Sequence, residues 1–141
     1  MSSGAQRWAI ESTEEFDDWI ERLAEEDQDH IVAALRVLER SGPGLGRPLV
    51  DSIKGSKHHN MKEIRVGALR ILFIFDPDRN AILLLGGDKT NRWEAWYVEN
   101  IPRADTLYDR YLEERRQRQV EEPTRQPQPI RRAPRRRGKR S

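Results

Sequence analysis

Residues 60 to 89, NMKEIRVGALRILFIFDPDRNAILLLGGDK, predict three β-strands joined by two short turns. The run from Asn60 to Val66 alternates, and Gly67-Ala68 suits a two-residue type II′ hairpin turn, which takes glycine first. The run from Leu69 to Phe75 is almost wholly apolar, which is typical of a central strand covered on both faces. A second turn and a third strand, Ala81 to Leu85, complete a three-stranded meander.

The turn at Gly67-Ala68 sets the register of the first hairpin. It pairs Val66 with Leu69 and Arg65 with Arg70, and directly paired residues point to the same face of a sheet. Two arginines therefore face each other across the hairpin, and like charges placed so cost up to ~1 kcal/mol. The intervening residues point to the other face, which is apolar and is expected to be core.

We expect a third cation at the same end of the sheet. In the matching register of the second hairpin, Arg70 lies opposite Gly86, and Lys89 follows shortly after. Arg65, Arg70 and Lys89 would then converge beside a residue without a side chain, which predicts an anion site, most simply for phosphate. The alternative is that Glu63, two residues from Arg65 on the same face, neutralises the arginine pair.

A short strand and two amphipathic helices are expected before the meander. The strand spans Arg7 to Glu11, and Ser12 to Glu15 matches a capping box with Ser12 as the N-cap of the first helix. A second helix begins at Asp27 or Asp29 and stops at the glycines and proline of residues 41–44. Apolar residues at helical spacing predict that the apolar stripes of the two helices face each other in an antiparallel hairpin. The connector 45–54 is extended and could supply one edge strand.

The segment after Lys89 is aromatic. Trp93, Trp96 and Tyr97 are spaced as on one short helical turn, and we expect the tryptophans to pack in the core. Tyr97 should lie beside the basic cluster, where it could stack on a base or donate a hydrogen bond. A final helix is predicted from Ile101-Pro102 to about Arg118, with the proline in its first turn.

Composition excludes several classes of protein. The 141 residues suit one domain, and without cysteine there is no disulfide framework and no thiolate metal site. His58 and His59 are adjacent on an extended segment and point to opposite faces, so we expect neither a metal site nor a cofactor. No run approaches the ~20 apolar residues of a membrane span, and the first residues lack the apolar core of a signal peptide. A cytoplasmic protein without membrane contact is expected.

Charge is unevenly distributed along the chain. The net charge is −8 over residues 1–39, +4 over 40–120 and +6 over 121–141. An acidic front and a basic remainder favour nucleic-acid binding on one side, unless the acidic part is only the solvated face of two helices. We expect residues 1–119 to form the domain and residues 120–141 to be a disordered basic tail rich in proline and arginine. The tail would either add salt-dependent affinity for nucleic acid or be an inert solubilising segment.

Two stretches, MKEIRVGALRILFIFD and LLLGGDKTNRW, resemble the RelE/HigB superfamily of bacterial toxins, in particular its phage-derived HigB-like branch. The resemblance covers roughly residues 8 to 116. With the element order above, it implies an α+β fold. A small antiparallel sheet, made of the meander and the N-terminal strand, packs against an N-terminal helical hairpin, and a C-terminal helix follows. It also implies a type II toxin that cleaves mRNA, usually on the ribosome, and is neutralised by a helix-turn-helix antitoxin.

The resemblance assigns roles to residues that the register also selects. Arg65, Arg70 and Lys89 match basic site residues of the family, and Arg92 is a weaker match. The chain departs from the pattern where many RelE-like enzymes carry lysines on the first meander strand, because Met61 and Glu63 stand there. It also lacks the histidine near the C-terminus that HigB enzymes can use.

The leading hypothesis is a metal-independent endoribonuclease in which the RNA 2′-hydroxyl attacks the adjacent phosphate and leaves a 2′,3′-cyclic phosphate. Arg65 and Arg70 would hold the phosphate, and Lys89 would stabilise charge or protonate the leaving oxygen. Tyr97, or Glu63 instead, would assist at the 2′-oxygen. The further candidates for contacts with RNA are Arg92, Lys62 and Lys57. The alternatives are a ParE-like gyrase poison with no chemistry of its own and a catalytically degenerate binding module.

Overall fold

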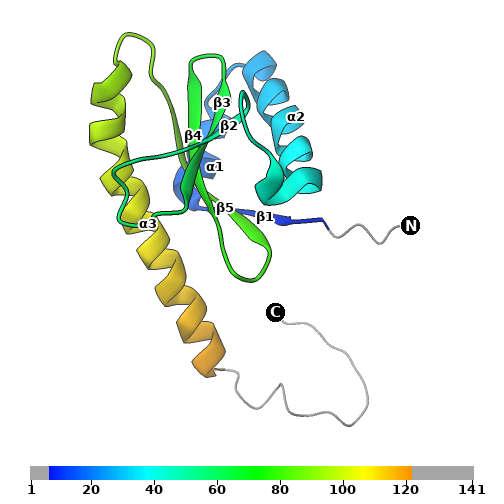
Figure 1. The fold of residues 1–141 in the computed structure, drawn as a ribbon, viewed down its shortest axis with the longest axis vertical. Coiled ribbons are helices and arrows are strands. Elements are labelled where there is room, and N and C mark those ends of the chain that lie inside the picture. Colours follow the sequence, from blue (N-terminus) through cyan, green and yellow to red (C-terminus); the bar gives the residue numbers. More distant parts are fainter. Residues whose placement is uncertain (1–6, 122–141) are drawn as a thin grey trace. The chain divides into compact units, whose positions relative to one another are not determined.

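The computed structural model describes residues 7–121 of the chain. The expected basic tail lies outside the described residues, except for its first two, Val120 and Glu121, which are helical. In chain order the elements are β1 (Ala9–Ser12), α1 (Glu14–Glu21), α2 (Glu25–Ser41), the 3₁₀ turn η1 (Gly42–Gly44), β2 (Val50–Ser52), β3 (Met61–Val66), β4 (Leu69–Phe75), β5 (Asn80–Asp88) and α3 (Trp93–Glu121). These elements and their labels are drawn in Figure 1.

The chain divides into two compact units after Tyr108. The first unit, Met1–Tyr108, holds the whole sheet, α1, α2 and residues 93–108 of α3. In the second unit, Asp109–Ser141, the described residues are the helical ones up to Glu121, where Arg116 forms an ion pair with Glu113 one turn earlier. The candidate site lies entirely within the first unit.

The five strands form one sheet in the order β1-β5-β4-β3-β2. β3, β4 and β5 are the predicted antiparallel meander, and β2 is the edge strand that the connector could supply. The α+β fold class is therefore confirmed. The sheet is mixed rather than wholly antiparallel, because β1 pairs with β5 in parallel. The long connection between these two strands, which contains both helices and the rest of the meander, makes a parallel pairing possible.

The first hairpin has the predicted register, with Arg65 opposite Arg70. The second hairpin begins as predicted, with Phe75 opposite Ala81, but then shifts by one residue at a β-bulge between Leu72 and Phe73. As a result Arg70 lies opposite Gly87, and the prediction of Gly86 was wrong. A bulge inserts one unpaired residue into one strand, here β5, and such an insertion moves every later pair.

The bulge is held by a contact from far along the chain. The Thr13 hydroxyl donates to the Leu84 carbonyl oxygen at 2.6 Å, and it also accepts the Phe16 amide hydrogen at 3.0 Å as the N-cap of α1. The predicted cap, Ser12, is instead the last residue of β1, because pairing with Leu83 keeps it extended. The second helix likewise begins earlier than predicted, at Glu25.

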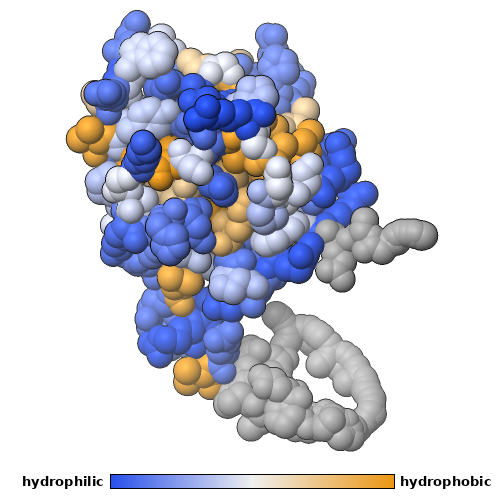
Figure 2. Space-filling model, in the orientation of Figure 1, coloured by the Kyte–Doolittle hydropathy of each residue, from blue (hydrophilic) through white to orange (hydrophobic). Residues whose placement is uncertain are grey.

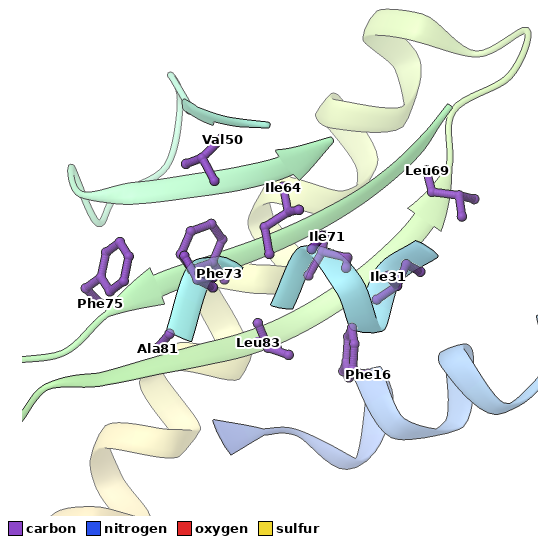
Figure 3. Packing of buried hydrophobic residues seen from close by; sticks show 12 residues of the cluster. Phe16, Ile31, Val50, Ile64, Leu69, Ile71, Phe73, Phe75, Ala81 and Leu83 are labelled. Carbon is purple, nitrogen blue, oxygen red and sulfur yellow. The ribbon is translucent and has the colours of Figure 1, made fainter. Parts of the chain in front are cut away.

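The core lies between one face of the sheet and the two N-terminal helices. Figure 3 shows Phe16 and Ile31 from α1 and α2 directed toward Ile71, Phe73 and Leu83 of the strands. These side chains are almost completely buried, as the apolar spacing of both helices predicted. Both apolar stripes thus lie against the sheet, and the expectation that they face each other was wrong.

Residues 93–108 of α3 cover the other face, so that α2 and this part of α3 lie on opposite sides of the sheet in Figure 1. The helix is continuous from Trp93, whereas a short turn and a separate helix from Ile101 were predicted. Pro102 is therefore an interior helix residue and removes one backbone hydrogen bond. Burial of Ile101 and Ala104 on either side of it holds this stretch in the helix.

The face of the protein that Figure 2 shows is mostly polar. On the face shown in Figure 2, hydrophilic residues surround separate apolar patches. None of the helices within residues 7–121 combines the length and the apolar character needed to cross a lipid bilayer.

Candidate active site

The candidate site lies on the α3 face of the sheet, beside the turn at Gly67-Ala68. β3 supplies Glu63 and Arg65, β4 supplies Arg70, and Lys89 follows the end of β5. The Lys89 amide donates to the Ala68 carbonyl oxygen at 3.1 Å, which fixes the lysine against the hairpin turn. The structure therefore brings together the three cations that the hairpin register selected, from three separate positions in the chain.

Glu63 is the central acceptor of this cluster and is only 3% exposed. Its Oε2 accepts from Arg65 Nε at 3.1 Å, and its Oε1 lies 3.6 Å from Arg70 Nε. Oε1 also accepts from the Tyr97 hydroxyl at 2.7 Å. The alternative interpretation of the arginine pair is therefore correct in part, because Glu63 does neutralise it. Glu63 thus contacts two of the three cations, Arg65 and Arg70.

Arg65 is held between two carboxylates. Besides Glu63, its Nη2 lies 3.9 Å from Asp51 Oδ2 on β2, and Asp51 also pairs with Arg47 Nε at 3.1 Å. The hydrogen bonds from Ser52 and Arg47 lower the pKa of the Asp51 carboxyl, so this group stays ionised. Arg65 is thus committed to partners within the protein.

Arg70 is buried and rigidly held, yet it keeps donors to spare. Its Nη1 donates to the carbonyl oxygens of Gly67 at 2.7 Å and Leu69 at 2.9 Å. Its Nε donates to the Tyr97 hydroxyl oxygen at 3.3 Å. Within residues 7–121 no acceptor bonds its Nη2, which carries two N–H groups. A fixed guanidinium with one free edge is suited to bind an oxyanion.

Lys89 is as deeply buried as Arg70, with 8% of its surface exposed. Its Nζ lies 3.9 Å from the centre of the Trp93 ring and 5.6 Å from that of Tyr97. No carboxylate in the described part of the chain comes within 4.0 Å of this ammonium. Burial, together with the nearby Arg70 guanidinium, lowers the pKa of Lys89, and Glu63 opposes the shift. A buried ammonium without a carboxylate is costly unless an anion binds there.

Tyr97 connects Glu63 with Arg70. Its hydroxyl donates to Glu63 and accepts from Arg70. Burial and the hydrogen bond to Glu63 raise the pKa of Tyr97, while Arg70 opposes the shift. Tyr97 is therefore a neutral phenol at neutral pH, able to pass a proton toward Glu63 but not to act as a phenolate base.

An open pocket of about 350 Å³ lies beside the two cations that have donors to spare. A volume of this size is at the lower end of the range of about 300–1,000 Å³ that is typical of ligand pockets. Arg65 does not line it. The lining residues are Gly67, Ala68, Arg70, Lys89, Thr90, Asn91 and Trp93.

Gly87 contributes to the site in a way that the sequence did not reveal. The sequence predicted that Gly86 would be the glycine opposite Arg70. The space left by its missing side chain was expected to be open to a ligand. A Cβ on Gly87 would instead lie 2.4 Å from Trp96 Nε1, so the space is filled by that indole. The close approach seats Trp96 on the sheet and positions the neighbouring Tyr97.

The other predicted RNA contacts are dispersed. Lys62 pairs with Phe73 and lies on the opposite face of the sheet, so the structure does not bring it to the site. Lys57 lies in a loop, and its backbone amide donates to the Asp105 carboxylate. Asp105 is about 12 Å along α3 from Tyr97, at 1.5 Å per residue. Arg92 precedes α3 next to the pocket, but its guanidinium is paired with Glu99.

Trp93 is a site residue that the sequence analysis missed. It was expected in the core, whereas it is 67% exposed and lines the pocket. Trp96, three residues later, is in the core as predicted. The helical spacing misled because Trp93, the first residue of α3, has φ +34° instead of the helical value of about −63°, so its side chain does not share the face of Trp96. Trp93 follows Lys89 by only four residues, and this closeness in sequence could have indicated that it belongs to the site.

The fold is that of the RelE class of toxins. It is similar to a mutant form of the Escherichia coli toxin RelE in the free state, with a TM-score of 0.52 and 11% identity, over 69% of this chain and 97% of that one. The sequence profile described as "Phage derived protein Gp49-like" matches residues 18–109. The chain therefore belongs to the phage-derived Gp49-like family, and the resemblance to the HigB-like branch is confirmed.

Two relatives from Mycobacterium tuberculosis carry toxin names. "Putative toxin HigB2" is 46% identical over 104 residues, which are 70% of this chain and 52% of that protein. "Putative toxin HigB3" is 48% identical over 96 residues, which are 67% of this chain and 84% of that protein. The chain thus spans about half the length of HigB2 and most of HigB3.

Proposed function

We propose that this protein is the toxin of a type II toxin–antitoxin system and cleaves mRNA as a metal-independent endoribonuclease. The observation that carries the proposal is the pocket that Lys89 and Arg70 line together. Among the described residues Lys89 is buried there without a carboxylate partner, and the free edge of Arg70 lies beside it. A phosphodiester supplies the missing negative charge and accepts from both groups. Membership of a family whose relatives carry toxin names supports the same conclusion.

The chemistry is an attack of the RNA 2′-oxygen on the adjacent phosphorus. Arg70 Nη2 and Lys89 Nζ bind the non-bridging oxygens, where negative charge develops. The 2′-hydroxyl proton passes to the Tyr97 oxygen as the phenol proton passes to Glu63, along the 2.7 Å hydrogen bond that joins them. The new bond to phosphorus forms as the bond to the 5′-oxygen breaks, and the 2′,3′-cyclic phosphate remains.

Lys89 donates the proton that the leaving 5′-oxygen takes. Burial and Arg70 lower the pKa of this ammonium, which makes it a stronger acid than an exposed lysine. After the products leave, solvent returns a proton to Lys89, and Glu63 releases the proton that it gained. Arg65 does not touch the phosphate in this scheme and acts as a positioning residue that holds Glu63.

The partners that we propose follow from this chemistry and from the family. The substrate is mRNA, and the ribosome presents it in the extended form that an in-line attack requires. A helix-turn-helix antitoxin is the proposed protein partner. Glu63 and Tyr97 are already hydrogen-bonded to each other and to the arginines. We therefore expect placement of the substrate by the ribosome to supply much of the rate enhancement.

Primer extension on cellular transcripts after brief induction tests the proposal. Breaks within coding sequence are expected for the parent, and none for Arg70→Ala, which lacks the fixed guanidinium. Arg36→Ala, which removes an exposed arginine from α2, is the matched control and should cleave like the parent. An SOS response without transcript breaks would instead identify a gyrase poison. A folded Arg70→Ala protein that cleaves as the parent does would contradict the site assignment.

A further inference from the structure

The indole of Trp93 is largely exposed, although one face of its ring lies against the Lys89 ammonium. It is the first residue of α3 and is 67% exposed, whereas Trp96 on the same helix is 3% exposed. Trp8 and Trp19 are half-buried against the core. A large aromatic side chain left in solvent at the rim of a basic pocket is a typical platform for a nucleobase.

The backbone of Trp93 is held in a conformation that bulky residues seldom adopt. Its φ of +34° lies in the left-handed region, as does the φ of +61° at Asn91 in the same loop. Such conformations are strained and are concentrated at ligand-binding sites. Burial of the indole does not offset this strain, since most of its surface is exposed.

The position of Lys89 determines which part of the indole is available. The ammonium lies over one face of the ring, 3.9 Å from its centre, and the ring in turn covers the lysine. A side chain that is two-thirds exposed with one face occupied has its opposite face largely in solvent. Lys89, Arg70 and Trp93 also line one pocket, so a phosphate on the cations and a base on the indole belong to the same stretch of RNA.

We propose that Trp93 is a stacking platform for the nucleobase that adjoins the phosphate held by Arg70 and Lys89. The pocket is then a site for a single-stranded nucleotide unit rather than for phosphate alone. Stacking on an indole tolerates every base, so the platform contributes affinity and orientation with little sequence preference. The inference rests on the proposed function, because it takes RNA as the ligand.

Binding to a non-cleavable RNA tests the platform. The probe is a 2′-O-methyl tetranucleotide with a 5′ fluorophore, titrated into the full chain and followed by anisotropy. Trp93→Ala should weaken binding on the order of tenfold, and Trp93→Phe should retain most of the affinity. Val32→Ala removes an exposed apolar side chain from α2 and is the matched control. The unlabelled oligonucleotide should quench the tryptophan emission of the parent, and inorganic phosphate should not.

Each outcome bears on one or both proposals. If Trp93→Ala binds as tightly as the parent while Lys89→Ala binds weakly, the platform is refuted and the phosphate site stands. If the parent binds no RNA, both proposals fail. If Trp93→Ala keeps its affinity for RNA but no longer co-elutes with the antitoxin, the indole belongs to a protein interface and the inference is overturned. Thermal unfolding of the variants confirms that they fold.

Discussion

Arg65 and Lys89 are two cations at the same end of one sheet, and their surroundings are opposite. Arg65 lies within 4.0 Å of two carboxylates, Glu63 and Asp51. Lys89 is more deeply buried and has aromatic rings around its ammonium instead. The charge of Arg65 is therefore balanced within the protein, whereas that of Lys89 needs a ligand. A cluster of basic residues thus divides into a part that organises the site and a part that is available to substrate.

Lys89→Gln should give the largest loss of activity, because it removes both the oxyanion contact and the acid for the leaving oxygen. Removal of such a group typically costs on the order of 10²-fold or more in rate. The measurement is single-turnover cleavage of mRNA on programmed ribosomes. The glutamine variant should be at least as stable as the parent, since the buried charge is lost. Full activity in a folded Lys89→Gln protein would contradict the assignment of Lys89 to the part of the cluster that is available to substrate.

Arg65→Gln should lose less activity, roughly tenfold or below, because its guanidinium acts on Glu63 and not on phosphate. The same single-turnover assay compares it directly with Lys89→Gln. Its effect should appear in the rate and not in the affinity for a non-cleavable RNA. A variant that loses RNA affinity as strongly as Lys89→Gln would show that Arg65 also binds substrate.

Gly87→Ala tests how Trp96 and Tyr97 are held against the sheet. The new Cβ would meet the Trp96 ring at 2.4 Å, and Trp96 packs edge-to-face on Tyr97 at 5.2 Å. Such overpacking typically destabilises a protein by about 1–3 kcal/mol. Urea unfolding measures the loss. Gly44→Ala is the control, because nothing lies within 4 Å of its Cβ. An unchanged midpoint for Gly87→Ala would mean that Trp96 has room to move.

The smallest expected effect is on the pH dependence of stability. In the folded protein the pKa of Lys89 is lowered by burial and by Arg70, whereas in the unfolded chain it is about 10.4. Between the two values the unfolded chain binds more protons, so the free energy of unfolding rises with pH. Urea unfolding at several pH values below about 9, where the tyrosines of the unfolded chain stay largely protonated, should show this rise in the parent and in Arg65→Gln. The rise should be absent in Lys89→Gln.

The parts of the molecule that local sequence determines were predictable. The turn at Gly67-Ala68 sets the pairing of Arg65 with Arg70, and the apolar run of β4 identified the central strand. The bulge at β5 was not predictable, because it depends on a contact from Thr13, 71 residues away in sequence. Pro102 was expected to begin a helix, but packing on the sheet overrides that local preference.

The site was predictable to a similar extent. Arg65, Arg70, Lys89 and Tyr97 were placed together from strand register and helical spacing, and the structure brings them together. Their catalytic roles stay predictions. The exposure of Trp93 was not predictable from helical spacing, because its φ of +34° departs from the helical value at the first residue of α3. The commitment of Arg65 to Asp51 was missed because the pairing of β2 with β3 has no local signal.

Phosphate binding in the pocket beside Lys89 is tested most directly by the ionisation of this lysine. The ¹³Cε resonance of this lysine, assigned by its loss in Lys89→Gln, is titrated with and without a 2′-deoxydinucleotide, which cannot be cleaved. The midpoint without ligand should lie below that of an exposed lysine, and the dinucleotide should raise it, because a bound phosphodiester stabilises the ammonium. A midpoint that does not move at saturating dinucleotide would contradict the claim that this pocket binds phosphate.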